Sequence, residues 1–271
     1  MHADGHGACF TDSGCTIRAM ELDVRYCTAE DGIRSVAKTL PSRRVSADLT
    51  ALSLAQFRPA PGRLVMPDVC CDLVWVRGCL TLTGPMTQAV ESRNVGADIT
   101  LLRLDPLVAY RLFGTPLSCF TDRVVKVADI NQGLADELEG VMRSGHLAGL
   151  VRCPSRAPAG VDERLSVAVD ALRRRTTVAA VASKIGISER HLERIFFEQM
   201  GLSPKTFARI IRFRRALKSA NTGASLAHAA ATAGYADQAH LSRDTRDLTG
   251  ASPSAILRHV GNVQDVVAGT M

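Results

Sequence analysis

The sequence predicts an α+β protein in which a β-rich region precedes an all-helical region. Three observations support this. Short apolar runs separated by Pro and Gly occur between residues 50 and 104 and are typical of strands. Apolar residues recur at helical spacing beyond residue 161. Between them, a stretch rich in Pro, Gly and small side chains is typical of a linker. We therefore expect domains at residues 46–150 and 162–259, joined by a linker at 151–161 and followed by a tail at 260–271.

Length and composition exclude several classes of protein. The 271 residues are enough for two modest domains, each with its own core. Hydrophobic residues make up 46% and charged residues 22%, which are ordinary globular values. No window approaches the roughly 18 consecutive apolar residues of a membrane-spanning helix. The N-terminus also has no apolar run long enough for a secretory signal. A cytoplasmic location without a membrane partner is therefore expected.

The N-terminal part divides into an irregular segment and a strand-rich segment. Residues 1–45 show no steady period and are expected to be peripheral, with Met20 as an alternative start to Met1. Short strands separated by turn residues then favour a small β-sandwich or barrel. The strand-like runs are residues 72–76, 79–83 and 99–102.

Two helices are predicted after these strands. Asp105 and Pro106 form the pattern of an N-cap followed by Pro at the first helical position, and Gly114 is expected to end that helix. A second helix is expected over residues 132–144. Its apolar face would comprise Leu134, Leu138, Val141 and Met142.

Charge is concentrated at one end of the chain. Residues 161–260 hold 16 Lys and Arg against 9 Asp and Glu, whereas the remainder holds 17 against 18. A local excess of this kind fits a surface that binds a polyanion, although a solvated Arg-rich surface would give the same count.

The eight cysteines all precede residue 154, and no pair has the C-x-x-C spacing typical of zinc or redox sites. In the cytoplasm we expect reduced thiols that act mostly as small buried hydrophobes. Sensing of oxidants or electrophiles by Cys70, Cys71 and Cys79 is the alternative. No metal and no cofactor are predicted.

An internal repeat occupies the C-terminal hundred residues. In the first copy Thr177 is the expected N-cap of an apolar helical pattern that Gly186 ends. In the second copy Ser225 and Gly234 stand at the same offsets, 48 residues later. In each copy a short turn then leads to a second helix, which starts at Ser188 in the first copy and at Asp237 in the second. Each second helix ends at Gly and is followed by Ser-Pro.

Two short helices joined by a tight turn form a helix-turn-helix, whose second helix enters the DNA major groove. We expect motif one at residues 178–200 and motif two at 226–249. The residues expected to build the motifs are Ala182, Gly186, Leu192, Phe196, Ala230, Gly234, Leu241, Gly250 and Pro253.

Outward-facing polar residues on the two second helices are the candidates for reading bases. An Arg can donate two hydrogen bonds to guanine, and a Glu can accept one from cytosine. Bridges from Arg194 and Arg243 to phosphates or to acidic neighbours are the alternative. The candidates are Arg190, Glu193 and Arg194 in the first motif, and Gln238, His240, Ser242 and Arg243 in the second.

Residues 162–259 resemble the DNA-binding domain of the AraC/XylS family of transcription regulators, whose signature matches residues 229–243 and 248–253. The resemblance implies that a long helix, from Pro204 to about Ala220, joins the motifs and that the recognition helices enter successive major grooves. The candidates for phosphate contacts are Ser188, Arg209, Arg212, Arg215 and Lys218.

One position departs from the family pattern. The family usually has Phe two residues after the Arg of the second recognition helix, as Phe196 is in the first repeat, but here the residue is Thr245. Loss of an aromatic core residue costs on the order of 3 kcal/mol unless neighbours repack. We therefore expect a looser second motif in which Asp244 and Asp247 lie near the groove and oppose phosphate binding. The first motif should then contribute more specificity.

The N-terminal domain resembles the β-rich, cupin-like sensor domain that precedes such motifs in a subset of regulators. The resemblance rests on residues 65–75, the Gly84-Pro85 turn, and residues 102–106 leading to 120–125. It implies effector binding or dimerisation and does not indicate a ligand. Because no His occurs between residues 45 and 145, a metal-dependent dioxygenase is disfavoured.

The sequence thus predicts a sequence-specific transcription regulator that catalyses no reaction. We expect an activator, with repression as the alternative. Its partners would be double-stranded DNA and RNA polymerase, with an effector and a homodimer left open. A DNA alkylation-repair protein with a Cys methyl acceptor is one alternative, but the chain lacks four Cys at metal spacing and a Cys followed by His. A DNA-binding architectural protein without sequence preference is the other.

Overall fold

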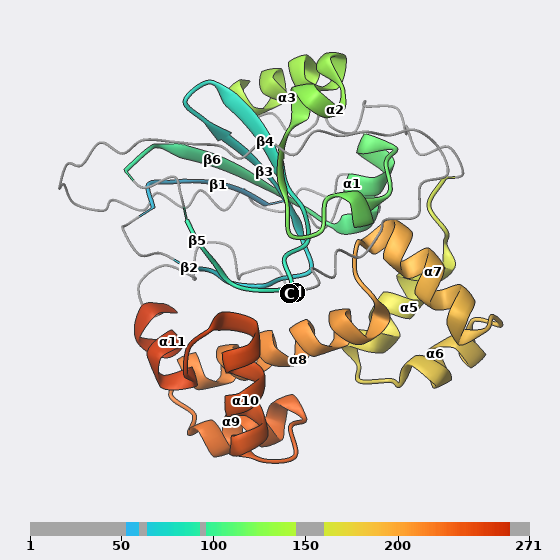
Figure 1. Ribbon diagram of the computed structural model, residues 1–271, viewed down its shortest axis with the longest axis vertical. Helices are drawn as coiled ribbons and strands as arrows, with labels where there is room; N and C mark the ends of the chain where they lie inside the picture. The colour runs from blue at the N-terminus through green and yellow to red at the C-terminus, as the bar shows by residue number, and fades with distance from the viewer. Residues whose placement is uncertain (1–52, 60–63, 93–95, 145–159, 261–271) are drawn as a thin grey trace, which may run out of the picture.

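A computed structural model describes residues 53–59, 64–92, 96–144 and 160–260 (Figure 1). The expected irregular segment at 1–45, most of the linker and the tail beyond residue 260 lie outside the described residues, as do Met20, Cys9, Cys15, Cys27 and Cys153. None of the helices in the described ranges is both long and apolar enough to span a membrane.

The N-terminal region is built on a five-stranded antiparallel sheet with strand order β1-β6-β3-β4-β7 (Figure 1). The turn between β3 and β4 consists of Arg77 and Gly78, both at positive φ, as a two-residue hairpin turn of type I′ requires. A separate two-stranded sheet pairs β2 with β5. The strands are β1 (Ser53–Phe57), β2 (Leu64–Val65), β3 (Cys71–Val76), β4 (Cys79–Thr83), β5 (Val90–Glu91), β6 (Ile99–Leu104) and β7 (Val124–Lys126).

The three strands predicted from the sequence are confirmed as β3, β4 and β6. The described strands form an open sheet with β1 and β7 at its edges, and helices cover one of its faces. The α+β fold class is therefore confirmed, whereas the likeness to a cupin stays a prediction. The division into domains at residues 151–161 is likewise still a prediction.

The two predicted N-terminal helices are present as α1 (Pro106–Phe113) and α3 (Gln132–Ser144). The side chain of Asp105 accepts a hydrogen bond from the Leu107 amide at 2.9 Å, and Gly114 ends α1 in the left-handed conformation. The 3₁₀ helix η1 (Leu117–Cys119) and the short α2 (Val127–Ile130) lie between α1 and α3.

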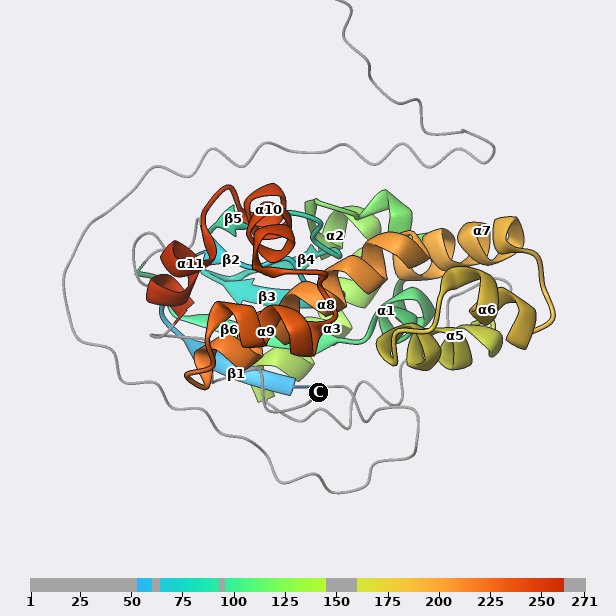
Figure 2. The same ribbon diagram turned by 90° about the horizontal axis from the view of Figure 1, so that it is seen from below.

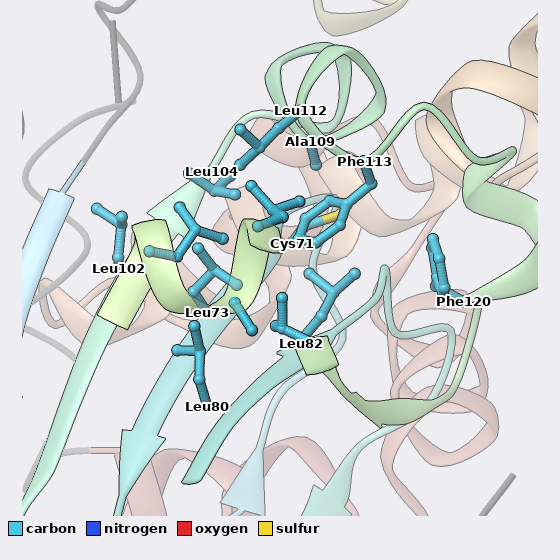
Figure 3. Packing of buried hydrophobic residues seen from close by; sticks show 14 of the residues in the cluster. Cys71, Leu73, Leu80, Leu82, Leu102, Leu104, Ala109, Leu112, Phe113 and Phe120 are labelled. Atoms are coloured by element: carbon cyan, nitrogen blue, oxygen red, sulfur yellow. The ribbon is translucent and has the colours of Figure 1, made fainter. Parts of the chain in front are cut away.

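The core of the N-terminal region lies between the sheet and these helices. Alternate residues of β3, β4 and β6 point to one face, where they pack against α1 and α3 (Figure 3). Cys71 is buried in this cluster. Burial raises the pKa of the Cys70 and Cys71 thiols, so the reactive thiolate is scarce at both. This favours the interpretation of the buried Cys71 as a small hydrophobe over oxidant sensing, whereas Cys70 is only partly buried.

The C-terminal region is all-helical, as predicted. Figure 2 shows two helical groups near opposite ends of the long helix α8 (Pro204–Asn221). Its bounds agree with the helix expected to join the motifs. The other helices are α5 (Arg164–Arg173), α6 (Val178–Lys184), α7 (Glu189–Met200), α9 (Leu226–Ala233), α10 (Gln238–Thr249) and α11 (Pro253–Val260).

Candidate nucleic-acid interface

The first motif is formed by α6 and α7. The Thr177 side chain caps α6 by accepting from the Ala180 amide at 3.3 Å. Gly186, at φ 71°, lies in the tight turn, and Ser188 caps α7 by accepting from the His191 amide at 3.2 Å. Because φ is positive at Gly186, a side chain there would be strained.

A compact apolar core holds these two helices together. Ala182, Leu192 and Phe196 are all buried in one cluster, and the Phe196 ring packs edge-on against that of Phe207 on α8, with centroids 5.3 Å apart. The core side of α7 is thereby fixed. Its opposite side is presented to solvent.

The base-reading candidates of the first motif lie on that exposed side. Arg190, Glu193 and Arg194 are all exposed. The Arg194 guanidinium lies 3.6 Å from a carboxylate oxygen of Glu198, one turn further along α7. The alternative expected for Arg194, a bridge to an acidic neighbour, is therefore present. An exposed pair of this kind is weak, which leaves the guanidinium available to another partner.

The second motif has the same geometry. Ser225 caps α9 and Asp237 caps α10, the latter by accepting from the His240 amide at 2.6 Å. Gly234 stands at φ 89°, and Gly250 ends α10 in the left-handed conformation. The remaining residues expected to build this motif, Ala230, Leu241 and Pro253, are buried.

Two of the four base-reading candidates on α10 are exposed. These are Gln238 and Arg243, whereas Ser242 is half-buried. The His240 ring packs edge-on against Tyr235, with centroids 5.1 Å apart. The structure therefore places all seven candidates on the two second helices, and His240 is the one with a ring partner in the core.

The expected position of Asp244 is wrong. This carboxylate is 6% exposed and lies inside the motif, where it accepts hydrogen bonds from the Tyr235 hydroxyl at 2.6 Å and from Arg209 Nε at 2.5 Å. Arg212 is within 3.6 Å of the same carboxylate, and its guanidinium covers the Tyr235 ring at 4.4 Å. The charge of Asp244 is therefore neutralised internally and does not face a phosphate.

Thr245 is fully buried, and its hydroxyl donates to the carbonyl of Leu241 at 2.8 Å. The polar atom that replaces the usual aromatic ring is therefore satisfied within the helix. Tyr235 supplies an aromatic ring to the small cluster that includes Leu241. Whether the second motif is looser stays a prediction.

Most of the phosphate candidates have internal partners. Arg209 is held by Asp244 and also by Asp247, at 3.1 Å. Arg215 donates to the carbonyl of Arg173 at 2.7 Å. Ser188 serves as the N-cap of α7, and Arg212 faces Asp244, while Lys218 is exposed in the last turn of α8.

Contacts between the N-terminal region and both motifs were not predicted from the sequence. At the end of α7, the Thr121 hydroxyl donates to the carbonyl of Gly201 at 2.5 Å, and the Tyr110 hydroxyl donates to Glu198 at 3.3 Å. A Cβ added at Gly201 would lie 3.0 Å from the carbonyl oxygen of Leu117. Both the positive φ and the limited space therefore favour glycine at this position.

The contact with the second motif is made by a different part of the N-terminal region. The Ala89 amide donates to the carbonyl of Leu248 on α10 at 2.7 Å. Met66 is buried with Leu248 and with Phe213 of α8. The N-terminal region therefore contacts both recognition helices in their C-terminal halves, and at α7 the contacted Glu198 also pairs with the base-reading candidate Arg194.

A buried ionic cluster lies on the face of the five-stranded sheet opposite the one that packs against α1 and α3. Arg103 pairs with Asp68 at 2.8 Å and with its cross-strand neighbour Asp72 at 2.9 Å. Burial raises the pKa of Asp68, while the charges of Arg103 and of Arg214 on α8 act in the opposite direction. Part of the charge around this cluster thus comes from the helix that joins the two motifs.

The comparisons with known proteins agree with the geometry of the C-terminal region. Residues 164–259 match a family model described as a helix-turn-helix domain. No curated protein matches the chain. Together with the two capped motifs, this match confirms that residues 164–259 are a helix-turn-helix domain of the AraC type. The chain is accordingly a DNA-binding transcription regulator.

Several solved structures are similar to the chain. The C-terminal domain of AraT, a response regulator from Geobacillus stearothermophilus, is 19% identical over 39% of this chain and 91% of that one, with a TM-score of 0.35. A probable AraC family regulator from Rhodopseudomonas palustris is 29% identical over 36% and 94%, with a TM-score of 0.31. ToxT from Vibrio cholerae is 11% identical over 77% and 98%, with a TM-score of 0.45.

Proposed function

We propose that this protein is a sequence-specific transcription regulator that reads two successive major grooves with α7 and α10. The observation that carries the proposal is the pair of capped second helices, each with exposed polar residues on the side away from its core. Helix α8 has 18 residues and is about 27 Å long at about 1.5 Å per residue. A connecting helix of this length is of the same order as one turn of DNA, about 34 Å, which is the spacing of successive major grooves.

The charge of the C-terminal region supports the same proposal. Arg190 and Arg194 on α7 and Arg243 on α10 are exposed and suited to bidentate contacts with guanine. Lys218 is a candidate for a phosphate contact that fixes the protein on the duplex. Arg209 acts differently in this proposal, because it holds Asp244 and so positions α10 on α8.

The proposal includes modulation of DNA binding by the N-terminal region. This region contacts α7 through Thr121 and α10 through Ala89, so it bears on the relative placement of the two recognition helices. An effector or a second copy of the chain that changed these contacts would change affinity for DNA. A regulator of this kind needs access to DNA and RNA polymerase, and the proposal therefore includes a cytoplasmic location.

The test is selection of bound sequences from random duplex DNA by the full-length protein at about 150 mM salt. We expect a consensus of two blocks about ten base pairs apart, bound at least 10³-fold more tightly than a scrambled duplex. Failure to enrich any sequence would contradict the proposal and favour an architectural protein. The double variant Arg194→Ala/Arg243→Ala should lose the preference while keeping salt-dependent binding to any duplex.

A further inference from the structure

One aromatic side chain of the first recognition helix has no place in the core. Phe197 is 50% exposed, whereas the other five Phe whose side chains are described are at most 5% exposed. Solvent exposure of an aromatic ring forgoes the stabilisation that its burial would provide. The exposed part of the Phe197 ring is therefore available to a partner outside the described residues.

Helix geometry places Phe197 among the base-reading candidates. At 3.6 residues per turn, it lies on the same side of α7 as Arg194, Glu193 and Arg190, which are three, four and seven residues earlier. Glu198, which accepts from Tyr110 of the N-terminal region, pairs with Arg194 and lies about 100° around the helix from Phe197. The half-exposed ring is thus presented with the polar stripe, beside the edge of α7 that the N-terminal region contacts.

The internal repeat gives an independent comparison. Leu192 and Leu241 correspond in the two copies, so Phe197 corresponds to Arg246, which is also exposed. This position is outside the core in both motifs. A long cation suits a phosphate or a guanine, whereas the apolar ring of Phe197 favours an apolar group on a base edge.

The major groove offers one apolar group on a base edge, the 5-methyl group of thymine. We propose that Phe197 is a specificity-determining residue that contacts the methyl group of a thymine in the half-site read by α7. This inference rests on the proposed function. Phe197 is about 4.5 Å along the helix axis from Arg194. Since base pairs are about 3.4 Å apart, the thymine is expected within one or two base pairs of the base that Arg194 contacts.

The test replaces each thymine of the α7 half-site in turn by deoxyuridine, which keeps every hydrogen-bonding group and lacks only the methyl. At one position, the full-length protein is expected to lose about fourfold in affinity, which corresponds to about 0.8 kcal/mol. Phe197→Ala should bind the thymine duplex about fourfold or more weakly and show no further loss with deoxyuridine. Phe197→Leu should retain most of the discrimination.

Arg246→Ala is the matched control, because it changes the corresponding residue of the other motif. It should leave the effect of deoxyuridine in the α7 half-site unchanged. Because Phe197 is half-exposed, its Ala variant should melt within a few degrees of the parent protein, which separates a binding effect from misfolding.

Two results would overturn the inference. Discrimination between thymine and deoxyuridine that persists in Phe197→Ala would show that another group reads the methyl and that the ring serves a different surface. The absence of any discrimination by the parent protein would exclude a methyl contact. Either result, obtained on a selected consensus, leaves the proposed function intact, whereas failure to select any sequence contradicts both.

Discussion

The two helix-turn-helix motifs share a backbone and differ in what holds them together. Both have capped helices, a Gly in the turn and a Gly at the end of the second helix. Motif one is closed by aromatic packing of Phe196 on Phe207. Motif two is closed by a buried carboxylate, Asp244, held by Tyr235 and Arg209. The comparison teaches that caps and turns preserve the geometry of a repeat while the chemistry of its core changes.

The largest effect is expected in the aromatic core of motif one. Phe196→Ala should destabilise the protein by about 4 kcal/mol, because it removes a fully buried ring and leaves a cavity. Thr245→Ala, at the corresponding position of motif two, should cost only about 1 kcal/mol, because the Thr245 hydroxyl merely donates to a helix carbonyl. Chemical denaturation of both variants measures the difference. Equal losses would mean that the two cores are not built differently.

Motif two is expected to depend on its buried carboxylate. Asp244→Ala should cost about 3 kcal/mol, because it leaves Arg209, Arg212 and the Tyr235 hydroxyl without their shared partner. Asp247→Ala is the matched control, since its carboxylate pairs with the same arginine but its side chain is 68% exposed. The control should change stability by less than about 1 kcal/mol. A tolerated Asp244→Ala would show that the ion network does not hold α10.

The two helix-ending glycines test contact with the N-terminal region. Gly201 and Gly250 have the same φ of 71°, so Ala should cost about 1 kcal/mol of backbone strain at either. An added Cβ meets the Leu117 carbonyl at Gly201 and nothing within 4 Å at Gly250. Gly201→Ala should therefore lose about 1 kcal/mol more than Gly250→Ala in thermal melting. Identical losses would contradict a close approach at the end of α7.

The smallest effect concerns alkaline pH. Burial raises the pKa of Tyr235, and hydrogen bonding to Asp244 raises it further. The unfolded chain loses this proton near pH 10 while the folded chain keeps it, so stability should fall as pH rises above about 10. Tyr235→Phe should cost about 1 kcal/mol at neutral pH and reduce this alkaline loss. A stability profile above pH 10 that is identical in both proteins would contradict the assignment.

Much of the C-terminal fold could be predicted because its signals are local. The N-caps Thr177, Ser188, Ser225 and Asp237 each act within three residues of themselves, and all four are confirmed. In the N-terminal region the Asp105 cap of α1 is confirmed for the same reason. Helix bounds follow from such short-range hydrogen bonds.

The rest depends on contacts between residues far apart in sequence. Sequence reasoning placed Asp244 near the groove, because an acidic residue on a recognition helix is usually solvated. Its burial follows from Arg209, which is 35 residues away. The contact of Thr121 with Gly201 spans 80 residues, and neither residue shows a local pattern that would indicate it. The pairing of Asp72 with Arg103 likewise requires the sheet register.

The central claim is that α7 and α10 read two grooves as a unit on one face of DNA. The most direct measurement is the affinity of the full-length protein for its selected duplex before and after insertion of five base pairs between the two blocks. Half a turn places the blocks on opposite faces of the duplex, so the account predicts a loss of more than tenfold. An affinity that is unchanged by the insertion would contradict the claim.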